Sequence, residues 1–288
     1  SHVDDLRRWF NTSETGAANY QFPRVRPLLF GMNPHWFSTP TSYPDSRDDQ
    51  MLIRIRTAGG TCVRSGIDWV TIETSRGNRD FGLFDYRVNL ALKYGLAWIA
   101  NVGTAPLWAA TVPDPTKPFM PVNDPNDYVN FVQATAQHFL GRIHHYECYN
   151  EPDFAWNYPP GTVNPQDKGA SYALWLPRFS TTIKGVDPAA WVSVGGLSNL
   201  HFDAGLPFLG GIYTVSGARG AFDAVACHPY GTAPSYLLDK GTSIDCSLLH
   251  AGDPTFPGLD GIIGLRKILD CFGDEYKPIW ITEYSNYH

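Results

Sequence analysis

Two glutamates, each at the end of an apolar run, are the residues of this sequence best suited to chemistry. Glu151 follows the run 145–150, directly after Asn150, and Glu283 ends the run 278–283. If these runs are parallel strands of a barrel, their carboxyl ends meet at one face, and the two carboxyl groups converge there. Cleavage of a glycosidic bond requires such a pair, one acid to protonate the leaving oxygen and one carboxylate to stabilise or attack the carbon it leaves.

Seven short apolar runs recur along the chain, and each is followed by a polar loop. Most are nearly continuous in hydrophobicity, which is typical of parallel strands that are covered on both faces. The runs are 27–31, 61–64, 96–102, 145–150, 191–195, 224–228 and 278–283.

Helical patterns separate these runs and indicate βαβ units. We expect helices over residues 84–94, 125–140 and 260–272, each followed by a glycine. Asp124 is a suitable N-cap for the second of these helices. Strands that alternate with helices of this length predict a parallel sheet in an α/β fold.

A barrel is favoured over an open, doubly wound sheet. No glycine-rich phosphate-binding loop opens the first helix, and Val194–Leu197, which resembles such a loop, lacks its spacing. Long loops rich in Pro, Trp, Asn and Gly follow the strand ends at 103–124, 152–169 and 229–257. We therefore expect a TIM (β/α)8-type barrel.

The eighth βα unit of such a barrel is missing, because the seventh run lies at the end of the chain. A closed barrel needs roughly 30 to 40 residues more. We expect one catalytic barrel domain over residues 1–288, truncated at its C-terminus. Three explanations stay open: the chain is truncated, the stretch 3–26 fills the gap, or a partner segment or domain completes the barrel.

Composition and charge exclude several classes of partner. The net charge is -6, with 22 Lys and Arg, so we expect no nucleic acid and no membrane as partner. There is no apolar run of 18 residues, and the first five residues contain no signal-peptide pattern. These residues assign no compartment, and an extracellular location is compatible with them.

The five cysteines show no metal-ligand spacing. Cys62, Cys148 and Cys227 lie in apolar runs, where a free thiol behaves as a small hydrophobic side chain. Cys246 and Cys271 lie in looser sequence, and we leave open whether they form a disulfide.

Several blocks of the sequence together resemble a known group of enzymes, the clan A glycoside hydrolases. In that clan an Asn-Glu-Pro motif follows the fourth strand and a second Glu ends the seventh. Within the clan the chain is most similar to family 39, which includes xylosidases, iduronidases and exopolysaccharide-hydrolase-like enzymes. The blocks are Gly66–Glu73, Phe84–Tyr86, Tyr94–Leu96, Gly103–Ala109, Tyr146–Pro152, Val194–Leu197 and Phe222–Tyr230.

The resemblance implies a retaining glycoside hydrolase that cleaves O-glycosidic bonds of an oligo- or polysaccharide by double displacement. Glu151 corresponds to the general acid/base and Glu283 to the nucleophile. Arg64 corresponds to the arginine that binds the nucleophile. Asn150 corresponds to the residue that binds the sugar 2-hydroxyl.

Further residues at strand ends are candidates for substrate binding, although each has a structural alternative. His228 and Tyr230 follow the sixth run, and His35 and Trp36 follow the first. Trp108 and Trp156 are candidate platforms for stacking against sugar rings, or else core residues. Asp68, Glu73 and Asp153 are weaker candidates that could equally cap helices.

Two other functions compete with this interpretation. A catalytically inactive carbohydrate-binding barrel would bind sugar without cleaving it, but retention of both glutamates and Arg64 argues against it. A metal-dependent hydrolase would need clustered histidines, and no His-x-His pair ends the first run. We expect no metal and no cofactor.

Overall fold

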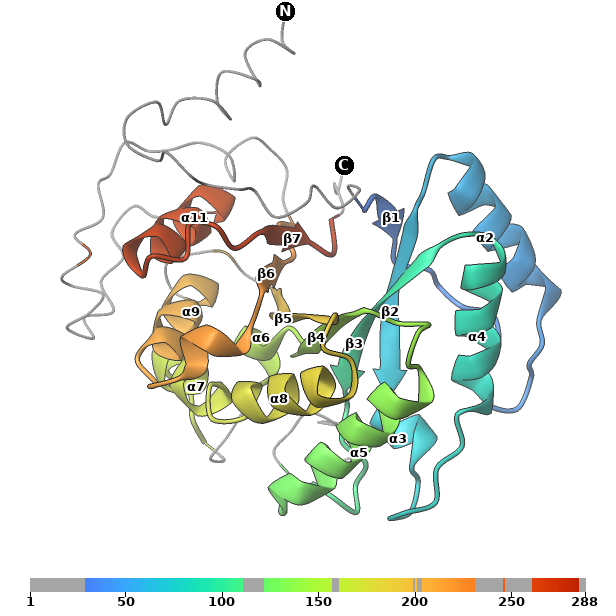
Figure 1. The fold of residues 1–288 in the computed structure, drawn as a ribbon, viewed down its shortest axis with the longest axis horizontal. Coiled ribbons are helices and arrows are strands. Elements are labelled where there is room, and N and C mark those ends of the chain that lie inside the picture. The colour runs from blue at the N-terminus through green and yellow to red at the C-terminus, as the bar shows by residue number, and fades with distance from the viewer. Residues whose placement is uncertain are drawn as a thin grey trace, which may run out of the picture.

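The computed structural model describes residues 29–110, 122–156, 161–198, 200, 204–230, 246 and 261–284. Within these ranges, seven parallel strands form a curled sheet in the order in which they follow in the chain (Figure 1). The strands are Gly31–Met32 (β1), Cys62–Asp68 (β2), Ala97–Gly103 (β3), His145–Asn150 (β4), Trp191–Leu197 (β5), Ala224–Cys227 (β6) and Ile279–Ile281 (β7).

All seven expected strands are present, with shifted ends. β2 extends to Asp68, four residues beyond the apolar run, whereas β7 ends at Ile281, so that Glu283 lies in the segment after it. Residues 27 and 28 of the first run lie outside the described residues.

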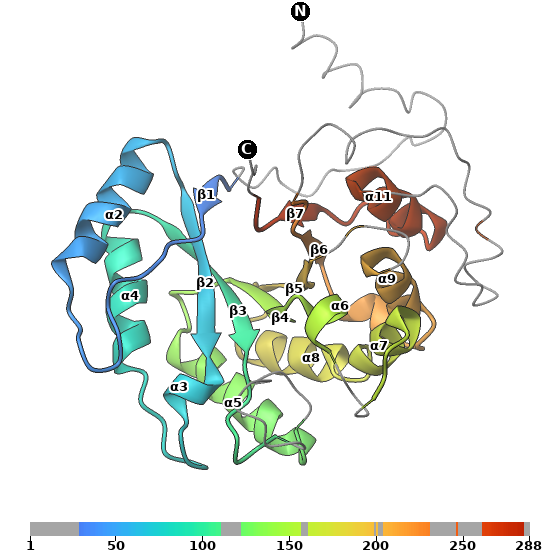
Figure 2. The ribbon, with the colours of Figure 1, turned by 180° about the vertical axis from the view of Figure 1, so that it is seen from behind.

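The helices lie around the outer side of the curled sheet, as the two opposite views show (Figures 1 and 2). They are Ser46–Thr57 (α2), Trp69–Ile72 (α3), Gly82–Lys93 (α4), Pro125–His138 (α5), Pro152–Ala155 (α6), Pro165–Tyr172 (α7), Leu176–Val186 (α8), Gly205–Tyr213 (α9) and Gly261–Cys271 (α11), with a 3₁₀ turn at Ala218–Ala221 (η1).

The three helices expected from the sequence are confirmed as α4, α5 and α11. The side chain of Asp124 caps α5 and accepts a hydrogen bond from the amide of Asn126 at 2.9 Å, because the first amides of a helix have no partner within it.

The core lies between the strands and the helices. On β2 to β5, one buried side chain from each strand faces the helices. These side chains are the register partners Val63 and Trp98, and Tyr146 and Val192. Further along β4, Cys148 contacts the hydroxyl of Tyr128 in α5. The outward-facing side chains of the strands thus pack against the helices.

The inner face of the sheet is polar at mid-height, which the apolar runs did not suggest. Asn101, Glu147 and Ser193 are register partners on β3, β4 and β5, so their side chains share one face of the sheet. Arg64 of β2 reaches this face and contacts Glu147. Polar side chains therefore replace part of the apolar layers that usually fill a barrel.

The sheet curls like a TIM barrel that lacks one unit. Among the described strands, β1 pairs only with β2, and β7 only with β6. Near the carboxyl ends of these two edge strands, the side-chain amide of Asn33 donates to the backbone carbonyl of Thr282 at 2.9 Å. Completion of the barrel by a further segment or domain stays a prediction. The stretch 3–26 lies outside the described residues.

A disulfide joins Cys246 and Cys271, the pair that the sequence left open. Cys62, Cys148 and Cys227 are free and buried. Within the described part of the chain, no helix is both long and apolar enough to span a membrane.

Candidate active site

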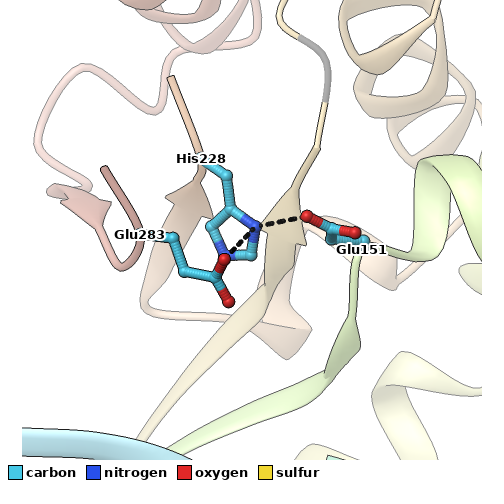
Figure 3. A group of neighbouring side chains, drawn as sticks. All are labelled: Glu151, His228 and Glu283. Carbon is cyan, nitrogen blue, oxygen red and sulfur yellow. Dashed lines mark hydrogen bonds and ion pairs between the residues drawn. The ribbon is translucent and has the colours of Figure 1, made fainter. Parts of the chain in front are cut away.

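Glu151 and Glu283, at the ends of β4 and β7, come together at one face of the curled sheet. One oxygen of each carboxyl group and one ring nitrogen of His228 all lie within 4.8 Å of one another. Figure 3 shows the imidazole of His228 between the two carboxyl groups. Glu151 and Glu283 are partly exposed, so a ligand can reach both.

The backbone at the end of β4 turns sharply to present Glu151. Tyr149 has φ 73° and Glu151 has φ 47°, conformations that L residues other than Asn or Asp seldom adopt. Pro152 begins α6 directly afterwards, and the amide of Glu151 donates to the carbonyl of Gly196 on β5 at 3.0 Å. A left-handed backbone conformation is unfavourable for a non-glycine residue and persists only where the surrounding structure holds it. Such residues are found most often at functional sites.

Arg64 connects the groups of the site. Its Nη1 donates to Oε1 of Glu283 at 2.6 Å, and its Nη2 donates to Oδ1 of Asn150 at 2.8 Å. Its Nε and Nη2 donate to Oε2 of Glu147 at 3.0 and 2.7 Å. Burial alone would lower the pKa of Arg64, but Glu147 and Glu283 outweigh it and raise that pKa. Arg64 is therefore a permanent cation beside Glu283.

His228 is buried and bridges the two glutamates. Its Nδ1 lies 2.9 Å from Oε1 of Glu151 and 3.8 Å from Oε2 of Glu283. The ring packs against Gly196, where a Cβ atom would lie 2.0 Å from Nε2. Only glycine leaves room for the imidazole at this point of β5.

Tyr230 completes the contacts of Glu283. Its hydroxyl donates a short hydrogen bond to Oε2, the oxygen that Arg64 does not bind. Each oxygen of Glu283 thus accepts a hydrogen bond. Together the two contacts fix the orientation of this carboxyl group.

The charges of the cluster do not balance. Glu147, Glu151 and Glu283 carry three carboxyl groups, and Arg64 is the single arginine that contacts any of them among the described residues. A proton on one carboxyl group, or a bound cation, would reduce the excess negative charge. The arrangement suits a site in which one carboxyl group is an acid and another an anion.

A metal ion is chemically compatible with part of the cluster. Glu151, His228 and Glu283 offer two carboxylate oxygens and a nitrogen, which are donor types that Zn²⁺ accepts. However, both oxygens of Glu283 already accept hydrogen bonds from Arg64 and Tyr230, so a metal would have to displace one of these partners.

The remaining candidate residues lie in different environments. His35 is exposed, whereas Trp36 is half-buried, stacks on Trp98 and donates to the hydroxyl of Ser65 at 3.0 Å. Trp108 is half-buried, and its indole nitrogen donates to the carbonyl of Glu73. None of these contacts joins them to Glu151 or Glu283.

The expectation that Trp156 forms a sugar platform is wrong. Its side chain is 2% exposed and packs against Tyr149, Tyr172 and Trp175, and its indole nitrogen donates to the hydroxyl of Ser171. Aromatic residues that follow a strand can turn into the core as readily as toward the substrate, and sequence spacing does not distinguish the two.

Two of the three weaker acidic candidates, Glu73 and Asp153, make hydrogen bonds to neighbouring parts of the fold. Glu73 accepts hydrogen bonds from Trp69, Gly77 and Arg79. Asp153 accepts from the amide and hydroxyl of Ser198. Glu73 and Asp153 therefore stabilise local structure. Burial raises the pKa of Asp68, although the charge of Arg87 opposes the shift.

Sequence reasoning missed two features of the site. Glu147 received no role, although a charged residue inside an apolar strand signals a buried partner. Phe154 of α6, which follows Glu151, is 75% exposed, and Tyr284, next to Glu283, is 64% exposed. Both residues are close to the two glutamates in the sequence, and their exposure was not predicted.

No model of a protein family matches this chain, and no curated protein matches it. Solved structures do. A family 39 glycoside hydrolase from Bacteroides cellulosilyticus WH2 is 21% identical with a TM-score of 0.52, over 70% of this chain and 40% of that one. A glucosidase from Croceicoccus marinus is 18% identical with a TM-score of 0.60, over 90% of this chain and 52% of that one.

A family 39 enzyme from Xanthomonas axonopodis pv. citri is 15% identical with a TM-score of 0.57, over 85% of this chain and 48% of that one. The chain thus spans about half the length of these proteins or less. At this level of identity the likeness concerns the fold. The chain shares the TIM-type barrel architecture of family 39 and other clan A glycoside hydrolases.

Proposed function

We propose that this protein is a retaining glycoside hydrolase that cleaves O-glycosidic bonds of an oligo- or polysaccharide. The observation that carries the proposal is the approach of the Glu151 and Glu283 carboxyl groups, whose nearest oxygens lie within 4.8 Å. Carboxyl groups about 5 to 5.5 Å apart characterise retaining enzymes, whereas inverting enzymes hold them about 6.5 to 9.5 Å apart to admit water.

The contacts of Glu283 suit a nucleophile. Arg64 and Tyr230 donate to its two oxygens, and Arg64 places a positive charge beside the carboxylate that must attack the sugar. The same contacts fix the direction of the carboxylate, and a fixed approach lowers the entropic part of the barrier.

The contacts of Glu151 suit an acid/base. Among the described residues no arginine or lysine pairs with it, and its side-chain hydrogen bond joins it to His228. The carboxyl group can therefore hold a proton and release it at the leaving oxygen.

The two carboxyl groups would act in two steps. In the first, an oxygen of Glu283 bonds to the anomeric carbon, the bond to the glycosidic oxygen breaks, and the proton of Glu151 passes to that oxygen. In the second, ionised Glu151 takes a proton from water, the water oxygen bonds to the anomeric carbon, and the bond to Glu283 breaks.

Asn150 is suited to bind the substrate beside this pair. Its side-chain oxygen Oδ1 accepts a hydrogen bond from Arg64, which fixes the orientation of the side-chain amide. The N–H groups of that amide can then donate to a sugar hydroxyl. We assign it the 2-hydroxyl, whose hydrogen bond strengthens in the transition state.

The proposal is tested with a panel of polysaccharides and aryl glycosides, scored for released reducing ends or phenol. Wild type should hydrolyse at least one member, and Glu283→Gln should abolish turnover on all of them. Glu151→Gln should retain activity only on aryl glycosides with good leaving groups, because these need less protonation.

Glu275→Gln, an exposed glutamate after α11, is the matched control and should behave as wild type. Equal loss by Glu151→Gln on good and poor leaving groups would contradict the role assignment. Binding of a sugar without any cleavage by wild type would instead favour a carbohydrate-binding barrel. Activity that is lost on chelation and restored by Zn²⁺ would favour a metal-dependent hydrolase.

A further inference from the structure

Glu147 is a buried charged residue that the proposed mechanism does not use. It lies on β4, the strand that also carries Asn150, and its side chain is 0% exposed. Its Oε2 accepts both hydrogen bonds from Arg64, and its Oε1 has no hydrogen-bond partner among the described residues. Burying a carboxylate is costly unless it is paired, so the pairing with Arg64 accounts for its place in the strand.

Because of the geometry of Arg64, its pairing with Glu147 determines where its other donors point. A guanidinium group is planar, and its donors form a rigid fork. Glu147 holds the edge made by Nε and Nη2, which fixes the plane of the group and thus the direction of Nη1. Nη1 is the atom that donates to Glu283 at 2.6 Å.

We propose that Glu147 is a positioning residue for the nucleophile: by holding Arg64, it aims Nη1 at Glu283 and Nη2 at Asn150. This inference rests on the proposed function, since it assigns Glu147 a part in the same reaction. β4 then contributes to both halves of the site, because it presents Glu151 at its end and orients Glu283 through Arg64.

Glu147 also shares the charge of Arg64. An arginine that faces two carboxylates neutralises neither completely. The negative charge of Glu147 offsets part of the attraction between Arg64 and Glu283, so the Glu283 carboxylate is less strongly stabilised than beside an arginine that bound it alone. Removal of the Glu147 charge should stabilise ionised Glu283 and weaken it as a nucleophile.

Two variants separate geometry from charge. Glu147→Asp keeps the charge but shortens the side chain by one methylene, so it cannot hold both donors of Arg64 in place. It should lower kcat by about 10²-fold with little change in KM, the cost expected for a misplacement of about 1 Å. Glu147→Gln keeps a nearly isosteric acceptor but removes the charge. It should lower kcat and move the acidic limb of the kcat/KM profile to lower pH.

Glu73→Gln is the matched control, because Glu73 is also buried and accepts from an arginine, Arg79, at 2.9 Å outside the site. It should keep the wild-type kcat and pH profile. Wild-type kcat and pH profile in both folded Glu147 variants would overturn the proposal. A loss matched by Glu73→Gln would also overturn it, because that loss would be structural.

A readout that does not depend on activity distinguishes this proposal from the proposed function. In a crystal structure of Glu147→Ala, Nη1 of Arg64 should have left Oε1 of Glu283, which it contacts at 2.6 Å in the parent protein. An unmoved Arg64 would contradict the positioning role. A displaced Arg64 in a protein whose wild type hydrolyses nothing in the panel would support the control of Arg64 and refute the glycosidase proposal.

Discussion

His228 Nδ1 lies 2.9 Å from Oε1 of Glu151 and 3.8 Å from Oε2 of Glu283, so one buried imidazole contacts the proposed acid and faces the proposed nucleophile. Its Nε2 is buried and has no hydrogen-bond partner among the described residues. In the neutral ring the proton therefore belongs on Nδ1, where it can be donated to Glu151.

This contact predicts a specific effect of His228 substitution. His228→Ala should slow hydrolysis of substrates with poor leaving groups by about 10²-fold or more, the scale of general acid catalysis, and spare those with good ones. His228→Asn places an amide N–H near the position of Nδ1 and should restore part of the rate. Kinetics on a series of aryl glycosides checks this. An equal effect of both substitutions on every leaving group would exclude a link to Glu151.

Phe154 and Tyr284 are exposed aromatic residues close to Glu151 and Glu283 in the sequence, and we predict that sugar rings stack on them. Phe154→Ala and Tyr284→Ala should each raise KM by about two- to twelvefold, because stacking on an aromatic ring contributes about 0.5–1.5 kcal/mol. Tyr276→Ala removes another exposed aromatic side chain, two residues after Asp274, and is the control. Unchanged KM in both site variants would show that neither ring contacts the substrate.

A buried ion cluster away from the site predicts how stability depends on pH. Asp274 is fully buried and accepts from Tyr213, Arg219 and Lys277. Burial alone would raise the pKa of Asp274, but these hydrogen bonds lower it, so its contribution is present above about pH 4 and is lost as pH falls through the folded-state value.

Asp274→Asn should lower the free energy of unfolding by about 3–5 kcal/mol at pH 7, because it leaves Lys277 buried without its carboxylate partner. The variant should also lose less stability than wild type between pH 5 and pH 2. Urea denaturation at a series of pH values measures both effects. If the free energy of unfolding falls equally with pH in both proteins, Asp274 does not cause the acid sensitivity, and the prediction is wrong.

The cysteines make a separate prediction. Burial raises the pKa of Cys62 to about 11 and those of Cys148 and Cys227 to about 12, so these thiols are neither ionised nor accessible near pH 8. Ellman's reagent should detect almost no thiol in the native protein, three after unfolding, and five after reduction. Five thiols without reduction would contradict the Cys246–Cys271 disulfide.

The sequence predicted the strands well because apolar runs between polar loops are a local signal. It also predicted that the carboxyl groups of Glu151 and Glu283 lie close together, because the carboxyl ends of the strands in a barrel share one face. It did not predict the inner polar row of Asn101, Glu147 and Ser193, because alternation within a strand shows that side chains change faces but not which face the barrel encloses.

The contacts that decide the roles were less accessible from the sequence. The link from Arg64 to Glu147 and the approach of His228 to Glu151 join residues far apart in the chain. Such pairings depend on the curvature of the sheet and on the bare Cα of Gly196, beside which the imidazole fits. The burial of Trp156 depends likewise on how α6 and α7 pack after the strand.

The stereochemistry of hydrolysis tests the central claim most directly. An aryl glycoside that the protein hydrolyses is used as substrate. Proton NMR early in the reaction shows the anomeric configuration of the released sugar before mutarotation. Double displacement through Glu283 predicts that the product keeps the configuration of the substrate. A product of opposite configuration would mean that water attacks directly, and it would contradict Glu283 as nucleophile.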